Sequence, residues 1–182
     1  MRWQELSTPI GGLGVAVDGD GVCRIRFGGA PGEAEAQRSA GAAEQPPRPP
    51  EAPPGGTAGE PEPLLDAAAD QLDRYFSGVL TEFTLPLSVT GGSDFERSVW
   101  RAIAAIPYGQ MRTYGEIAAD VGDSGAARAV GIACNRNPLP LVVPCHRVVG
   151  AGGKLVGFGG GLPRKRFLLE LEARVRIERD FA

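Results

Sequence analysis

The sequence predicts a mixed α/β protein built in two parts, and three observations lead to this. Residues 1–27 alternate apolar and polar side chains, a pattern typical of short strands joined by turns. Residues 93–106 instead place apolar side chains at helical spacing behind a capping-box pattern. Gly91-Gly92, directly before the helical block, is typical of a linker. We therefore expect a small N-terminal α/β domain over residues 1–91 and a mostly helical domain over residues 92–182.

The N-terminal block carries the signals of strands followed by a helix. The runs 13–17 and 22–27 alternate apolar side chains on either side of an Asp-Gly turn signal. Apolar residues at helical spacing predict a helix over 65–76. We expect an edge strand over 83–89, because Pro86 has no amide hydrogen to give to a central ladder.

Residues 28–63 predict a disordered insertion or a long exposed loop. They hold 9 prolines and 7 glycines, together with six acidic and two basic residues, for a net charge of −4. Such a composition has too few apolar side chains to pack a core. The charge matters for the rest of the chain, because residues 101–169 carry nine basic and three acidic side chains, net +6. A basic region suits a polyanion such as nucleic acid, although scattered solvated charge explains the count equally well.

Composition excludes several classes of protein. The 182 residues are 42% hydrophobic, which is enough for a core, and no apolar run approaches the ~20 residues of a membrane helix. Residues 1–10 lack the basic-then-apolar pattern of a signal peptide. Three cysteines at irregular spacing argue against a disulfide framework and for a reducing compartment.

The second block predicts two short helices joined by a turn, as in a helix-turn-helix. Thr113 and Glu116 form a capping-box pattern that opens a helix through about Asp120. Ser124 is a candidate cap for a further helix over 126–134. This helix is made mostly of tiny residues, which would allow close approach to a surface or simply close helix packing. They are Ala126, Ala127, Ala129, Gly131 and Ala133.

The candidate chemistry lies where Cys145 is followed by His146, the single histidine of the chain. A thiol becomes a strong nucleophile when a nearby imidazole accepts its proton. Adjacent side chains on a strand point to opposite faces, so cooperation requires a bent backbone or a bridging water. Pro144 makes an irregular backbone reasonable. The alternative is a buried structural cysteine beside a surface histidine at a strand end.

Several further motifs stand around this pair in a fixed order. They are IPYG at 106–109, TYGEIA at 113–118, RAVG at 128–131, NP at 137–138, PCHRV at 144–148, GFGGGL at 157–162 and LLELE at 168–172. On these motifs, residues 93–172 resemble the O6-alkylguanine-DNA alkyltransferase family. The resemblance implies a ribonuclease-H-like N-terminal domain and a helical C-terminal domain with a helix-turn-helix.

The resemblance also implies an activity. The protein would repair DNA by moving the alkyl group from O6-alkylguanine to its own cysteine, irreversibly and once per molecule. The target base would be flipped out through the minor groove. Double-stranded DNA containing alkylated guanine is the implied partner, with no cofactor and no membrane, and the protein is expected to be a monomer. Activity on O4-alkylthymine stays open.

The family's roles carry over to matching residues. Cys145 would be the nucleophile, His146 would accept its proton through a water, and Glu172 would hold His146. Asn137 would fix the turn before the active-site segment. Tyr114 would contact a phosphate and assist protonation of the leaving guanine.

The resemblance assigns DNA contacts and a substrate pocket as well. Arg128 would fill the space of the flipped base, beside the small residues Ala126, Ala127, Ala129 and Gly131. The pocket would be formed by Pro140, Val148, Phe158, Gly159, Gly160 and Lys165. Phe158 is usually tyrosine in the family, so a hydroxyl is missing here. The glycines around it would leave a roomy pocket.

Further expectations follow. Cys23 resembles a zinc ligand of some relatives, but a zinc site needs about four ligands, so we predict no metal. Arginine outnumbers lysine 17 to 2, as in GC-rich bacterial genomes. Together with the reducing compartment and the implied DNA partner, this leads us to expect a bacterial cytoplasmic protein at the nucleoid. A lesion sensor of the same fold is disfavoured because it would lack Cys145. A cysteine hydrolase is disfavoured because nothing in the sequence indicates a carbonyl substrate. A transcription factor built on the helix-turn-helix is disfavoured because Arg128 is the only base-reading side chain on the second helix.

Overall fold

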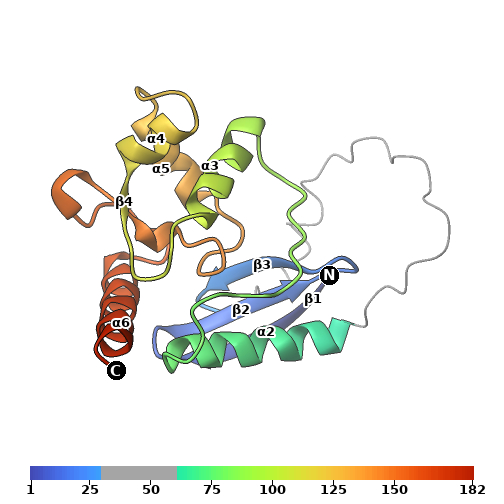
Figure 1. Cartoon of the computed structure of the whole chain (residues 1–182). Coiled ribbons are helices and arrows are strands. Elements are labelled where there is room, and N and C mark those ends of the chain that lie inside the picture. The colour runs from blue at the N-terminus through green and yellow to red at the C-terminus, as the bar shows by residue number, and fades with distance from the viewer. Residues whose placement is uncertain (30–60) are drawn as a thin grey trace, which may run out of the picture.

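The computed structural model describes residues 1–29 and 61–182. The N-terminal part is an antiparallel sheet in the order β1-β2-β3, which confirms the predicted strands (Figure 1). Strand β1 covers Arg2–Thr8, β2 covers Gly11–Val17 and β3 covers Val22–Phe27. The alternation predicted for β2 does not appear in its burial, because all of its last five residues are buried.

Helix α2, Pro61–Phe76, packs against this sheet (Figure 1). Its buried face is Leu65, Ala68, Leu72 and Tyr75. The helix begins three residues inside the segment expected to be a loop, because Pro61 is tolerated in a first helical turn and Glu62 suits its positive end. At the other end of that segment, Gly29 forms a bridge with Leu13. The remainder, residues 30–60, lies outside the described residues.

The edge strand expected over 83–89 is wrong. A single parallel bridge joins Val22 to Leu87, with Val22 N donating to Pro86 O at 2.8 Å and Ser88 N donating to Val22 O at 2.9 Å. Pro86 has no amide hydrogen to donate, so the ladder cannot extend through it. Phe83 and Leu85 instead pack against the core as partly buried side chains.

Three helices form the upper part of the C-terminal block in Figure 1: α3 Asp94–Ala104, α4 Tyr114–Asp120 and α5 Ala127–Asn135. The two predicted capping boxes are present, at Ser93 with Glu96 and at Thr113 with Glu116. They satisfy amide groups that a helix start leaves free.

Ser124 does not cap α5, contrary to expectation. The N-cap is Ala126, which makes no side-chain cap hydrogen bond. Asp123 holds the turn instead: Gly125 N donates to its carboxylate at 3.1 Å and Ala126 N donates to its backbone oxygen at 3.0 Å. The short turn between α4 and α5 leaves α5 beginning two residues later than a Ser124 cap requires.

A two-stranded parallel pair and a long helix complete the fold. Strand β4, Arg112–Thr113, pairs with β5, Val148–Val149, and so brings the start of α4 beside the active-site segment. A short 3-10 turn, η2, covers Ala151–Gly153. Helix α6, Leu162–Asp180, runs beside both parts of the molecule (Figure 1). One continuous cluster of buried apolar residues runs through both parts. In the described residues, the helices are too short or too polar to cross a membrane.

Candidate active site

The active-site segment bends at Cys145. Residues Cys145–Arg147 form a 3-10 turn, η1, directly before β5, so the expected strand end is a turn instead. Cys145 N donates to Val143 O at 2.8 Å and Arg147 N donates to Pro144 O at 3.0 Å. The turn provides the irregular backbone that a cooperating Cys-His pair requires, and both side chains are buried.

Asn137 ties the end of α5 to this turn. Its side-chain amide donates to Val143 O at 2.8 Å, and its side-chain oxygen accepts from Leu139 N at 2.9 Å. The loop between them contains Leu141, whose φ of 75° is positive despite its side chain. Asn137 therefore bonds to both ends of the loop from Leu139 to Val143, which leads into the turn.

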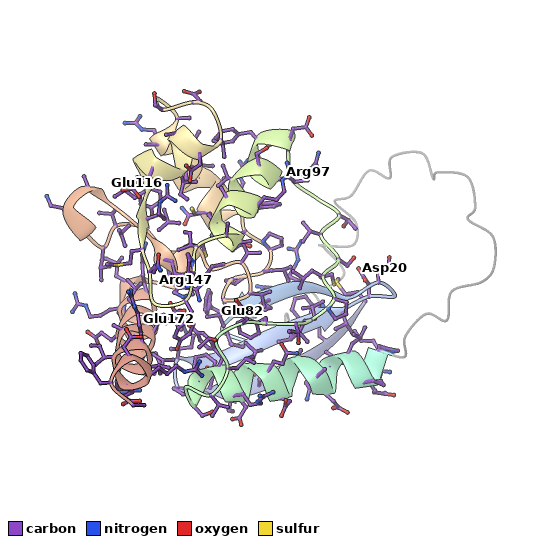
Figure 2. All side chains as sticks on the ribbon, viewed as in Figure 1. Asp20, Glu82, Arg97, Glu116, Arg147 and Glu172 are labelled. Atoms are coloured by element: carbon purple, nitrogen blue, oxygen red, sulfur yellow. The ribbon has the colours of Figure 1, made fainter. Side chains whose placement is uncertain are left out.

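Glu172 of α6 is the centre of a buried polar cluster. Oε1 lies 2.8 Å from His146 Nε2 and accepts from Arg147 Nη2 at 2.8 Å. Arg147 Nε donates to Oε2 at 2.9 Å, so the guanidinium binds the carboxylate with two nitrogens. Figure 2 shows these two side chains meeting between α6 and the active-site turn. The carboxylate also accepts from Tyr75 Oη at 2.8 Å and from Gly109 N at 3.2 Å.

This cluster fixes the protonation states around His146. Burial raises the pKa of Glu172, but the hydrogen bonds and charges of His146 and Arg147 prevail and lower that pKa to about 2. Burial lowers the pKa of His146, opposed by Glu172, so the imidazole is neutral near pH 7. With an ionised carboxylate at Nε2, that nitrogen carries the hydrogen and Nδ1 is the acceptor. Nδ1 is buried and has no hydrogen-bond partner among the described protein atoms.

Cys145 is a protonated thiol at rest. It is 5% exposed. Burial raises its pKa, while a hydrogen bond from Asn137 and the charge of Lys165 act in the opposite direction. A base is therefore required before this sulfur can act as a nucleophile at neutral pH. Burial likewise raises the pKa of Cys134 to about 12, with Cys145 as a further cause, so the second thiol is inert.

A cavity of about 200 Å³ opens onto Cys145. Of the predicted pocket residues, Pro140, Phe158 and Gly159 line it, together with Asn137. The other three predicted pocket residues, Val148, Gly160 and Lys165, do not line it. Five further lining residues were not predicted. Three come from β3, namely Ile25, Arg26 and Phe27, and two come from α5, namely Cys134 and Asn135.

Lys165 joins β5 to the loop that carries Phe158. It is fully buried, and Nζ donates to Val148 O at 2.5 Å and to Gly157 O at 3.2 Å. It also lies 3.4 Å from Tyr114 Oη, which donates to Val156 O at 2.9 Å. Burial raises the pKa of Tyr114 to about 12, so its hydroxyl keeps its proton at neutral pH.

The predicted DNA-contact residues lie on α5 and at its N-cap, except for Tyr114, which begins α4. Arg128 and Ala129 are exposed, whereas Ala126, Ala127 and Gly131 are half-buried. A Cβ atom at Gly131 would lie 3.9 Å from the Tyr114 ring, an ordinary contact distance, so α5 lies directly beside the first residue of α4. One side of α5 thus packs inward while Arg128 points to solvent.

Sequence analysis did not identify Tyr75 or Phe27 as residues of the site, and it assigned no role to Arg147. A tyrosine on the apolar face of a predicted helix signals a hidden partner, because a buried hydroxyl finds a hydrogen bond. No comparable signal marked Phe27. Cys23 has no companions for a metal site: residues 1–29 and 61–182 contain no cluster of three His, Cys, Asp or Glu side chains that could hold an ion.

Two family models match this chain. The model described as 6-O-methylguanine DNA methyltransferase, ribonuclease-like domain, matches residues 1–89, and that described as the DNA binding domain of the same family matches residues 94–174. Among curated proteins, the methylated-DNA–protein-cysteine methyltransferase of Mycobacterium tuberculosis H37Rv is 57% identical over 113 residues, 62% of this chain and 68% of the relative. Its counterpart from Methanosarcina acetivorans is 52% identical over 113 residues, 62% of this chain and 72% of the relative.

Solved structures agree over nearly the whole chain. The Mycobacterium tuberculosis O6-methylguanine methyltransferase has a TM-score of 0.74 at 42% identity, covering 95% of this chain and 93% of that one. The M. tuberculosis OGT in complex with DNA has a TM-score of 0.74 at 43% identity, with the same coverage. The chain therefore belongs to the 6-O-methylguanine DNA methyltransferase family, whose activity is the repair of O6-methylguanine in DNA by methyl transfer to a protein cysteine.

Proposed function

We propose that Cys145 is the acceptor and that it reacts by an in-line displacement. Its sulfur attacks the alkyl carbon, a carbon–sulfur bond forms, and the bond from that carbon to O6 of guanine breaks with its electron pair. The observation that carries this proposal is the position of Cys145 on the cavity that Pro140, Phe158 and Gly159 line. The product is a thioether, which is a poor leaving group, so each molecule acts once.

The thiol proton leaves through His146. Nδ1 is the acceptor nitrogen of a neutral imidazole and makes no bond to the described protein atoms, so a water between it and Cys145 completes the relay. Glu172, bonded to Nε2, stabilises the imidazolium that results. Tyr114, whose hydroxyl keeps its proton, assists protonation of the leaving guanine.

Double-stranded DNA containing alkylated guanine is the proposed partner. This is supported by the relative from M. tuberculosis that was solved in complex with DNA. The small residues of α5 suit the narrow minor groove, and the exposed Arg128 enters the base stack where the target nucleotide leaves it. Flipping is necessary because a buried thiol cannot reach O6 of a stacked base.

Three broader assignments belong to the same proposal. The chain divides into domains 1–91 and 92–182, in keeping with the two family models. It acts as a monomer and needs no cofactor, because the displacement requires only a nucleophile, a base and a proton donor. It works in the bacterial cytoplasm at the nucleoid, as the bacterial relatives and the three free cysteines favour.

The decisive experiment is mass spectrometry of the intact protein after mixing with a duplex that carries one O6-methylguanine. Wild type should gain one methyl group, located on the peptide that contains Cys145. Cys134→Ala, the matched control, should gain it equally, and Cys145→Ala should gain none while still binding DNA, since phosphate contacts supply most non-specific affinity. Methylation of Cys145→Ala would refute the assignment.

A further inference from the structure

The cavity at Cys145 has walls from both parts of the chain. Strand β3 contributes Phe27, and the loop before α6 contributes Phe158. We propose that Phe27 is a specificity-determining residue that contacts apolar alkyl groups larger than methyl, and that Arg164 positions it. The proposal deepens the function above and rests on Cys145 as the acceptor.

The two rings meet edge to face. Their centroids are 5.4 Å apart and their planes make an angle of 62°, an arrangement that aromatic pairs favour. Strand β3 is fixed to the active-site region by Ile25 N, which donates to Pro138 O at 2.8 Å. Phe27 thus forms part of a rigid cavity wall although it lies more than a hundred residues before Cys145 in the sequence.

Gly160 brings these rings close to the backbone of the loop. A Cβ atom there would come within 2.9 Å of both Phe158 and Phe27, which no side chain tolerates without displacing the rings. The aromatic wall is therefore seated directly on the pocket loop, and its position depends on how that loop and β3 are held together.

Arg164, in the first turn of α6, holds them together. Its Nε donates to Ile10 O at 2.7 Å, in the turn between β1 and β2, and its Nη1 donates to Gly160 O at 3.0 Å. Its Cζ lies 5.5 Å from the centroid of the Phe27 ring, within the range of a cation–π contact. One half-buried side chain therefore joins the N-terminal hairpin, the Phe27 ring and the pocket loop.

This wall distinguishes alkyl groups by the contact that they make. A methyl group on O6 is small and sits at the sulfur, whereas a benzyl group extends further into the cavity and can pack against an aromatic ring. An aromatic pair adds enough stabilisation to change a rate by about 3- to 10-fold. Phe27 should therefore contribute to benzyl transfer and little to methyl transfer.

The test compares two duplexes of one sequence, carrying O6-benzylguanine or O6-methylguanine at the same position. The measured quantity is the ratio of the two second-order transfer rates. Phe27→Ala should lower the benzyl-to-methyl ratio about 3- to 10-fold, and Phe27→Leu, which keeps most of the apolar volume, should lower it less. Phe76→Ala removes an equally half-buried ring from α2, lining a different groove, and should leave the ratio unchanged.

Arg164 is tested with the same ratio, which a general loss of stability would not move. Arg164→Met keeps the apolar stem but removes the donors, and should lower the ratio in the same direction as Phe27→Ala. Arg164→Lys should restore part of it, and Arg166→Met, an exposed control on the same helix, should not change it. A wild-type ratio in both Phe27 variants would overturn the proposal. Failure of Cys145 as the acceptor is a separate outcome, because Cys145→Ala would then still gain the methyl group.

Discussion

The Tyr75 hydroxyl donates a 2.8 Å hydrogen bond to Oε1 of Glu172, 97 residues further along the chain. Tyr75 lies on α2, beneath the N-terminal sheet, and Glu172 lies on α6. Both side chains are almost completely buried. The N-terminal part therefore helps to hold the carboxylate that orients His146, in addition to forming a wall of the cavity.

Removing that hydroxyl should weaken both the fold and the reaction. In Tyr75→Phe the buried carboxylate loses one of its donors, which should cost about 1–3 kcal/mol of unfolding free energy. Transfer should slow because Glu172 orients His146 less firmly. Denaturant unfolding and single-turnover kinetics measure the two effects.

Tyr108→Phe is the matched control for this experiment. The Tyr108 hydroxyl is buried but has no hydrogen-bond partner among the described residues. Its removal should be neutral or slightly stabilising, because no bond is lost and a desolvated polar group disappears. Equal destabilisation by both variants would show that the bond to Glu172 is not what Tyr75 contributes.

Local patterns predicted much of the fold. Both capping boxes, the alternating strands and the helix around Leu72 are encoded by neighbouring residues, so each was predictable without knowledge of the rest of the chain. The failures lie where two local signals compete and the pattern does not say which prevails. The ladder near Pro86 ends after one bridge, and the turn before α5 is held by Asp123 in place of Ser124.

Residues of the candidate site could be predicted where the residue type itself indicates a chemical role. Cys145, His146 and Glu172 follow from the motifs, although the 3-10 turn that unites the first two does not. Phe27 could not be predicted, because its role arises only from how the N-terminal sheet lies against the pocket loop. An apolar ring at a strand end carries no chemical signal of its own.

Glu172 should make stability depend on pH in acid. Its folded pKa of about 2 lies below the ordinary value of 4.5. The charged carboxylate therefore contributes stability that is complete above pH 4.5 and is lost as the pH falls toward 2. Each unit of pKa difference is about 1.4 kcal/mol, so the loss is about 3 kcal/mol.

Glu172→Gln isolates this contribution. The variant should be less stable at pH 7 by about 3–5 kcal/mol, because the buried Arg147 charge is left uncompensated. It should also lose less stability than wild type between pH 4.5 and 2, since an amide does not titrate. Urea unfolding at several pH values measures both, with the exposed Glu170→Gln as control. Parallel acid profiles for wild type and Glu172→Gln would contradict the assignment.

His146→Ala should slow transfer at pH 7 and be rescued in part by alkali. Without the imidazole, only thiol that has already ionised can react, and burial raises the pKa of Cys145. The rate of the variant should therefore climb about tenfold for each pH unit below that pKa. Wild type should show a weaker dependence, because its relay removes the proton during the reaction. A variant with the wild-type rate at pH 7 would remove His146 from the mechanism.

Arg128→Ala should slow repair of duplex DNA far more than reaction with free O6-benzylguanine. The free base requires no flipping, whereas a stacked base must be extracted at a cost of a few kcal/mol that Arg128 offsets by filling its place. On that basis the duplex rate should fall on the order of tenfold or more, and the free-base rate should change little.

Arg136→Ala is the control, because Arg136 is an equally charged, exposed side chain at the other end of α5, paired with Glu96. Its loss should weaken duplex binding mainly through general electrostatics and in a salt-dependent way. Equal slowing of both substrates by Arg128→Ala would show that the residue acts on the pocket or on folding and not on the flipped nucleotide.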